Sequence, residues 1–242
     1  MTEEDAFENM QQFLSEFKGD INIIDEKIDI KLQIEYFDMS KEMKDKVIAF
    51  TEWELKSEML YDVNIPLGAK KKILVRLASV DNVKAYRIIE SFAKIADESI
   101  KYWALLALQE SRMLLQSKLL DQSQVLISTG LGGKGNKLRY FFVIFANNEP
   151  SFSEYQQKVI KNEFEYILHR NNAEIEEINF IDNIATLILL IPLNVPIQNI
   201  FSKTITECNL YGNFLKDNCI ITNVRILDID EIKNILKSPE KL

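Results

Sequence analysis

Hydrophobic residues in the first half of the chain mostly recur with the period of a helix. Over residues 3–18 they fall three or four positions apart, acids occupy the first turn, and Gly19 stands where glycine often caps a helix end. The same period predicts further helices before residue 121. They cover residues 40–61, 67–79, 82–96 and 98–120.

One segment departs from this pattern. Between residues 28 and 36, Ile, Leu and Tyr alternate with Asp, Lys, Gln and Glu, which is the period of a strand. Because a lone strand needs a partner, residues 28–36 are predicted to join the edge of a later sheet or a sheet in another subunit.

Residues with special backbone preferences separate the predicted helices. Pro66 suits the first turn of the helix that follows it. Asp81-Asn82 and Asp97 mark the next two breaks, and Asp at each break is predicted to accept hydrogen bonds from free N–H groups of the following helix.

Strand and helix patterns alternate in the second half. Residues 138–146 (LRYFFVIFA) are rich in aromatic and β-branched residues, which is typical of a strand. A helix follows to about Arg170, and Ser151 with Glu154 is predicted to form its capping box. Two strands joined at Asp182-Asn183, a helix, a strand and a terminal helix complete the chain. They cover residues 174–181, 184–192, 196–215, 219–227 and 228–237.

These patterns predict an α+β protein and carry two resemblances. The run from Leu67 to Leu115, with its Ala/Leu-rich YWALLALQESR, resembles HEAT-type helical repeats, although a plain helical bundle fits nearly as well. The HEAT resemblance implies a stacked-helix surface that binds other proteins. The later strand-helix-strand-strand-helix-strand order resembles the ferredoxin-like split βαβ fold. The predicted divisions are a helical region (1–127), a Gly-rich loop or linker (128–137) and a ferredoxin-like domain with a C-terminal helix (138–242).

Composition favours a globular chain without metal or cofactor chemistry. Of the 242 residues, 47% are hydrophobic and only 7 are Gly and 5 Pro, so long regular elements are expected. One His and two Cys remove most zinc sites and any disulfide framework. The acidic N-terminus is unlike a secretory signal, and the apolar stretch 184–193 is too short for a membrane span. We therefore expect a cytoplasmic protein without metal, cofactor or membrane association.

Charge is unevenly distributed along the chain. Residues 1–65 carry 7 Lys/Arg and 17 Asp/Glu, residues 66–139 carry 13 and 6, and residues 140–242 carry 9 and 14. The basic middle segment is expected either to pair with its acidic neighbours or to contact an acidic partner or nucleic acid. The overall pI near 5.0 makes non-specific nucleic-acid binding the weaker of the last two.

The Gly-rich loop is the one local anomaly. Its GxGxxG spacing does not mark a dinucleotide site, because a helix precedes it and a strand follows, and Asn136 stands where a phosphate-binding loop has Lys. The loop is interpreted as a linker or hairpin turn, as an anion or partner contact, or as a catalytic cradle. The residues that would bind are Gly130, Gly132, Gly133, Lys134, Gly135, Lys137 and Arg139.

Other candidates have structural explanations. His169 falls in the last turn of a predicted helix, where the helix dipole favours a cation, and the two cysteines are predicted to be small core residues. The strand aromatics Tyr140, Phe141, Phe142 and Phe145 would stack RNA bases only with aromatics on a neighbouring strand. The expected partner strand, residues 185–190, has none.

No catalytic residue is predicted. We therefore expect a non-enzymatic protein-interaction or adaptor protein, with a protein partner at its helical half and a second contact or homodimer interface at its α/β half. The alternative is a ligand- or nucleic-acid-binding regulatory module that uses residues 66–139 and the Gly-rich loop. An enzyme ranks third, since it would need a pocket joining His169 or buried acids to that loop.

Overall fold

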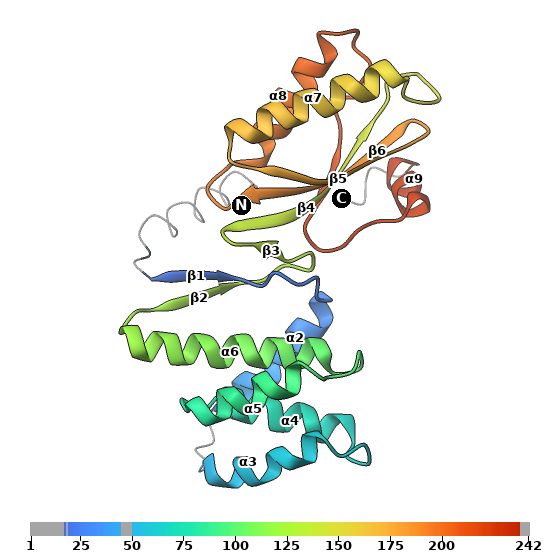
Figure 1. Ribbon diagram of the computed structural model, residues 1–242. Helices are drawn as coiled ribbons and strands as arrows, with labels where there is room; N and C mark the ends of the chain where they lie inside the picture. The colour runs from blue at the N-terminus through green and yellow to red at the C-terminus, as the bar shows by residue number, and fades with distance from the viewer. Residues whose placement is uncertain (1–16, 18, 45–49, 238–242) are drawn as a thin grey trace. The chain divides into compact units, whose positions relative to one another are not determined.

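The computed structural model describes residues 17, 19–44 and 50–237, and the chain divides into two compact units (Figure 1). The helical unit contains residues 17–24 and 28–127, and the α/β unit contains residues 25–27 and the chain from Ser128 onward. The mixture of helices and antiparallel sheet is the predicted α+β class.

The helical unit is built from helices and one pair of short strands. Its elements are β1 (Asp20–Ile23), α2 (Ile30–Lys44), α3 (Phe50–Lys56), the 3-10 turn η1 (Ser57–Leu60), α4 (Leu67–Ala78), α5 (Val83–Ala93), α6 (Lys101–Leu120) and β2 (Gln124–Ile127). The three predicted helices between residues 67 and 120 are present as α4, α5 and α6. The predicted helix over residues 3–18 lies outside the described residues except for Phe17. The predicted helix over residues 40–61 corresponds to the end of α2 followed by α3 and η1, and residues 45–49 are not described.

Residues 28–36 were wrongly predicted to form a strand, since α2 begins at Ile30. The alternating pattern also places Ile28, Leu32 and Tyr36 four residues apart, on one face of a helix. Ile28 and Tyr36 are buried whereas Ile34 is 55% exposed. Asp29, which alternation placed on a polar strand face, instead accepts hydrogen bonds from the backbone N–H groups of Lys31 and Leu32 and so caps the helix.

The parallel pair β1–β2 has no counterpart in the predicted elements. Asp20 lies opposite Gln124 and Ile23 opposite Ile127. Each strand has only four residues, too few for a clear alternation. Gly19 lets the chain approach closely here, because a Cβ at this residue would lie 1.8 Å from the carbonyl oxygen of Ser123.

Helix starts follow the sequence signals with one change of residue. Pro66 is the N-cap of α4. At the next break the cap is Asn82, whose side chain accepts from the backbone N–H of Lys84, and not the predicted Asp81, which pairs with Lys118. Asp97 accepts a backbone hydrogen bond from Ser99 in the turn before α6, but the N-cap of α6 is Ile100, which makes no side-chain cap.

The α/β unit has the predicted order of strands and helices. Its elements are β3 (Gly133–Lys134), β4 (Lys137–Phe145), α7 (Glu154–Arg170), β5 (Glu174–Ile181), β6 (Ile184–Pro192), α8 (Ile197–Asn209), β7 (Ile220–Thr222) and α9 (Ile229–Lys237). Strand β4 pairs with β6 on one side and with β3 and β7 on the other, β5 pairs with β6, and every pair is antiparallel. This is the strand arrangement of a ferredoxin-like split βαβ unit.

Three boundaries in this unit differ from the sequence-based prediction. The capping box of α7 is formed by Ser153 and Gln156, two residues after the predicted Ser151–Glu154 pair. Helix α8 ends at Asn209, because the chain then turns through Gly212 and Asn213, which both have positive φ. Strand β7 is limited to the three residues that pair with β4.

Both faces of β4 are covered within the α/β unit. Alternate residues of β4 point to opposite sides: Phe142 and Ile144 pack with the apolar residues of α7 and α8, whereas Phe141, Val143 and Phe145 pack with Ile232 of α9. Figure 1 shows α7 and α8 on one side of the sheet and α9 on the other. The face on which a second copy was expected to pack therefore carries α9.

The start of α9 is stabilised by a set of charged contacts around Glu231. Arg225 donates hydrogen bonds of 2.7 and 2.6 Å to the Glu231 carboxylate. Asp228 and Glu231 also accept from each other's backbone N–H groups, as in a capping box. The hydrogen bonds from Arg225 and then from the Asp228 backbone lower the pKa of Glu231 to about 2.

Acid is therefore expected to weaken the start of α9. Because the folded pKa of Glu231 lies below its ordinary value of 4.5, these contacts stabilise the fold fully above that value and are lost as pH falls through about 2. A carboxyl NMR titration should give Glu231 a midpoint near 2. A midpoint that stays near 4.5 in the folded protein would contradict the pairing.

Candidate functional site

The Gly-rich loop is an ordered part of the α/β unit. Gly133-Lys134 pairs with Lys137-Leu138 in a hairpin, and Gly135 takes the positive φ of 63° that the turn requires. Leu131 is 2% exposed within the core beside α9. The loop is thus fixed by core packing and strand pairing.

Two of the three cations predicted to hold an anion already have carboxylate partners. Lys137 Nζ lies 2.5 Å from Glu174 Oε1, and Arg139 Nη2 donates to Glu176 Oε1 at 2.9 Å. Arg139 Nη1 also donates to the carbonyl of Leu131. Their side chains are only 12% and 11% exposed. An anion at the loop would therefore compete with built-in carboxylates.

Lys134 is exposed and has no ion pair among the described residues. The predicted anion or partner contact at Gly130, Gly132, Gly133, Lys134, Gly135, Lys137 and Arg139 stays a prediction. The acids beside it are unsuited to proton transfer as general acids. Hydrogen bonds from Lys137 and Arg139 lower the pKa values of Glu174 and Glu176, whereas a general acid needs a raised one.

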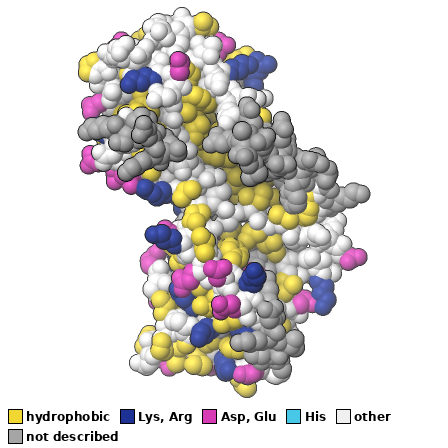
Figure 2. All heavy atoms as spheres, turned by 180° about the vertical axis from the view of Figure 1, so that it is seen from behind, with side chains coloured by type: hydrophobic (Ala, Val, Ile, Leu, Met, Phe, Trp, Pro, Cys, Tyr) yellow, Lys and Arg dark blue, Asp and Glu magenta, His cyan; other side chains and the backbone are white. Residues whose placement is uncertain are grey.

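Ion pairs also connect the basic middle segment to its acidic neighbours. Lys71 Nζ lies 2.8 Å from Glu35 Oε1, and Lys84 Nζ lies 3.7 Å from Glu54 Oε1. On the helical unit, Figure 2 shows acidic and basic side chains next to one another. This mixing removes part of the positive field that a nucleic acid would require.

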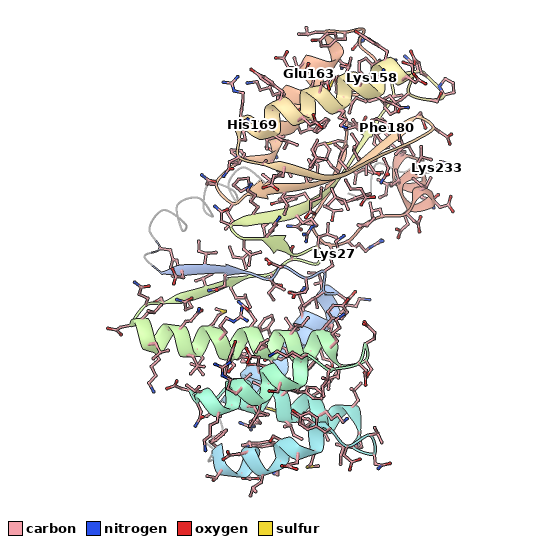
Figure 3. The ribbon with its side chains drawn as sticks, in the orientation of Figure 1. Lys27, Lys158, Glu163, His169, Phe180 and Lys233 are labelled. Atoms are coloured by element: carbon pink, nitrogen blue, oxygen red, sulfur yellow. The ribbon has the colours of Figure 1, made fainter. Side chains whose placement is uncertain are left out.

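The other sequence candidates occupy structural positions. His169 is exposed in the last turn of α7 (Figure 3). Burial raises the pKa of the Cys208 and Cys219 thiols to about 12, so both are protonated at neutral pH. Over the ranges that the structure describes, no group of three or more His, Cys, Asp and Glu is placed to hold a metal ion.

The aromatic residues of β4 are not available for base stacking. Phe142 packs against Phe164 and Phe201 in the core beneath α7 and α8. Phe141 and Phe145 are 3% and 1% exposed in the core beneath α9. Because both faces of the strand are covered, these rings serve as core.

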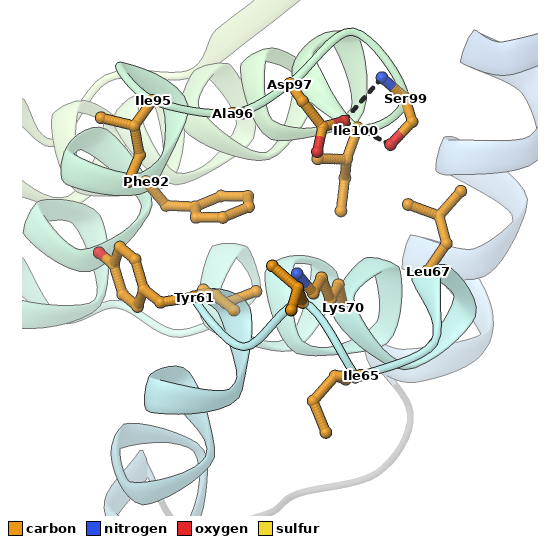
Figure 4. Close-up of a pocket in the computed structure, with 12 residues that line it drawn as sticks. Tyr61, Ile65, Leu67, Lys70, Phe92, Ile95, Ala96, Asp97, Ser99 and Ile100 are labelled. Carbon is orange, nitrogen blue, oxygen red and sulfur yellow. Dashed lines mark hydrogen bonds between the residues drawn. The ribbon is translucent and has the colours of Figure 1, made fainter.

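A group of exposed apolar residues surrounds a hollow in the helical unit. Residues 60–70, from η1 into α4, and residues 92–100, from α5 towards α6, line a groove of about 400 Å³ (Figure 4). We call this surface the apolar groove. Its lining residues are Leu60, Tyr61, Val63, Ile65, Leu67, Lys70, Phe92, Ile95, Ala96, Asp97, Ser99 and Ile100.

The groove has a buried floor and an exposed rim. Leu60 and Ile100 are 1% and 3% exposed, whereas Val63 is 91% and Ile95 66% exposed. At one end, the Tyr61 and Phe92 rings meet edge to face with their centroids 5.7 Å apart. The rim therefore presents apolar area to solvent above a fixed base.

Two charged residues flank this apolar lining on opposite walls (Figure 4). Asp97 Oδ1 accepts from the hydroxyl and the backbone N–H of Ser99. These hydrogen bonds, with a smaller contribution from the charge of Lys70, lower the pKa of Asp97. Lys70 lies on the α4 wall and has no ion pair with any described residue. The groove thus combines apolar walls with a cation and an anion that form no ion pair with each other.

Sequence reasoning missed the groove because it assigned apolar residues to helix faces. Tyr61, Val63 and Ile65 lie between η1 and α4, and Ile95 and Ala96 lie after α5, where helical periodicity has ended. Bulky apolar residues in connecting segments have no helix face to fill. Their presence in those segments was the sequence signal for an exposed apolar surface.

A second cavity of the helical unit, of about 490 Å³, lies beside Glu110 of α6. The Glu110 carboxylate accepts from the Tyr36 hydroxyl at 2.6 Å and from Ser40 Oγ at 2.7 Å. Together with desolvation, which is the larger cause, the Glu110 charge raises the pKa of Tyr36. These bonds join α2 to α6, so Glu110 is explained by the packing of the unit.

No protein-family model and no curated protein matches this chain. Within the described part of the chain, no helix has the length and apolar character to cross a membrane. The structure itself therefore defines the class: an α+β protein whose helical unit carries an open apolar groove.

Proposed function

We propose that this chain is a non-enzymatic protein-interaction or adaptor protein, cytoplasmic as expected from its sequence, whose helical unit docks a protein partner in the apolar groove. The observation that carries this proposal is the exposed apolar rim around a hollow with a buried floor. A stacked-helix surface of this kind is what the HEAT resemblance implies for the unit.

The exposed rim supplies a driving force for association. Covering a Val or Ile side chain that is largely exposed contributes roughly 1–2 kcal/mol from apolar area alone. The edge-to-face Tyr61–Phe92 pair adds a rigid aromatic anchor of the type common in interface hot spots.

Replacing Ile95 with Asp is expected to abolish partner capture without unfolding the protein, because the side chain is 66% exposed. An unpaired carboxylate on the rim would have to be desolvated on docking, and capture should fall at least about tenfold. The measurement is quantitative affinity capture from native lysate, with nuclease-treated and untreated samples in parallel.

Leu119→Asp is the matched control, since Leu119 is 79% exposed in α6 and does not line the groove. It should capture the same proteins as the unchanged chain. If Ile95→Asp also retains them, the groove is not the docking site. Loss of every captured protein on nuclease treatment would instead favour the alternative function, nucleic-acid binding through residues 66–139 and the Gly-rich loop.

The homodimer expected at the α/β half stays a prediction. Because α9 covers the β4 part of one face of the sheet with Ile232 and its neighbours, a second copy would have to pack elsewhere. Light scattering over micromolar concentrations tests it, and a strict monomer throughout that range would contradict the dimer.

A further inference from the structure

We propose that the segment bound in the apolar groove is a peptide stretch of the partner that carries a carboxylate next to its apolar anchors, and that this carboxylate pairs with Lys70. This inference rests on the proposed function and adds the chemistry of the partner.

Lys70 is the observation that selects an acidic partner. Two other lysines of the same unit, Lys71 and Lys84, pair with Glu35 and Glu54. Lys70 lines the groove among apolar side chains and makes no ion pair within the described ranges. A cation surrounded by apolar walls loses hydration when a partner covers it, so an unpaired Lys70 would oppose docking. A carboxylate on the partner removes that cost.

Asp97 offsets the charge of Lys70 only in part, because the Lys70 charge is one of the smaller causes that lower the pKa of Asp97. Its Oδ1 is committed to the N–H and hydroxyl of Ser99, and the two charged groups form no ion pair within 4.0 Å. Asp97 also sets the orientation of the bound segment. A carboxylate of the bound segment is attracted by Lys70 on the α4 wall and repelled by Asp97 on the other wall. The acidic residue of the segment must therefore lie on the side of Lys70.

The openness of the groove favours a peptide over a fatty acid, which offers the same combination of carboxylate and apolar chain. Sites for small apolar ligands bury most of the ligand surface. Here the rim residues Tyr61, Val63 and Ile95 are 50%, 91% and 66% exposed. Side chains projecting from a peptide backbone can cover such a rim while the backbone stays in water. An alkyl chain has no such backbone.

The test is selection of a random peptide display library against the full chain, followed by affinity measurements on the selected peptides. We expect enrichment of sequences in which Asp or Glu stands close to Leu, Ile or Phe, and loss of their binding with Ile95→Asp. Lys70→Met should weaken the acidic peptides about tenfold, as expected for a lost charge-assisted contact. Lys70→Glu should shift selection to Lys- or Arg-bearing peptides.

Lys72→Met is the matched control, because Lys72 is exposed on the same helix and does not line the groove. It should leave the affinities unchanged. Groove-binding peptides without an acid preference, or equal effects of Lys70→Met and Lys72→Met, overturn the inference but leave the proposed function intact. Peptides insensitive to Ile95→Asp count against the proposed function itself. If no peptide is selected but laurate binds tightly and Lys70→Met weakens that binding, the groove belongs to a fatty acid and the inference is overturned.

Discussion

Gly130→Ala is expected to destabilise the α/β unit by about 3 kcal/mol, near the upper end of the usual cost of overpacking. A Cβ at Gly130 would lie 1.7 Å from the carbonyl oxygen of Val224, and a backbone atom cannot rotate away as a side chain can. The backbone around Gly130 cannot easily shift either, because the N–H of the next residue, Leu131, donates to the Asn223 carbonyl at 3.0 Å and its side chain is buried in the core.

The measurement is urea denaturation, with hydrogen exchange of the β4 amides to locate the effect. Gly68→Ala is the matched control, since a Cβ at Gly68 would meet nothing within 4 Å. Gly68 lies in α4, where Ala is favoured over Gly by up to about 1 kcal/mol. Equal unfolding midpoints for the two variants would contradict the close approach at Gly130.

Trp103→Ala is expected to cost the helical unit about 4 kcal/mol, in the range for removing a buried Trp. Trp103 is fully buried, and its ring centroid lies 5.2 Å from that of Tyr36. Its indole N–H donates to the carbonyl of Lys71 at 3.1 Å, and Lys71 Nζ lies 4.2 Å from its ring centroid. The substitution therefore removes contacts among α2, α4 and α6 together.

Urea denaturation followed by helical circular dichroism measures this loss. Trp103→Phe keeps an aromatic ring but leaves the Lys71 carbonyl without its donor, so a smaller loss of about 1–2 kcal/mol is expected. Trp53, on α3 of the same unit, remains in both variants as a fluorescent reporter. A cost below about 1 kcal/mol for Trp103→Ala would show that the site is not packed as described.

Long amphipathic segments were the most predictable part of the fold. The stripes of apolar residues in α4, α5 and α7 are local signals, because each helix satisfies its backbone hydrogen bonds within itself and needs a core only on one side. The order of strands and helices in the α/β unit followed from the same local patterns, and the turn at Asp182-Asn183 joins β5 and β6 as predicted.

Short or ambiguous segments were not predictable in this way. Ile28, Leu32 and Tyr36 satisfy both a two-residue and a four-residue spacing, so the period alone cannot separate strand from helix. The Asp29 cap and the burial of Tyr36 beside Trp103 decide for the helix. The pairing of Asp20–Ile23 with Gln124–Ile127 joins segments about a hundred residues apart and depends on the helices between them.

The candidate site also has features that local sequence patterns predict and features that only tertiary packing sets. The sequence by itself determined the α+β class, the main helices and the uneven charge of the chain. Only the tertiary structure decided that Lys137 and Arg139 are paired with Glu174 and Glu176, and that Lys70 lies in an apolar groove. Local periodicity records which face of an element is apolar. Ion pairs and grooves depend on which distant segments meet, and that is set by packing.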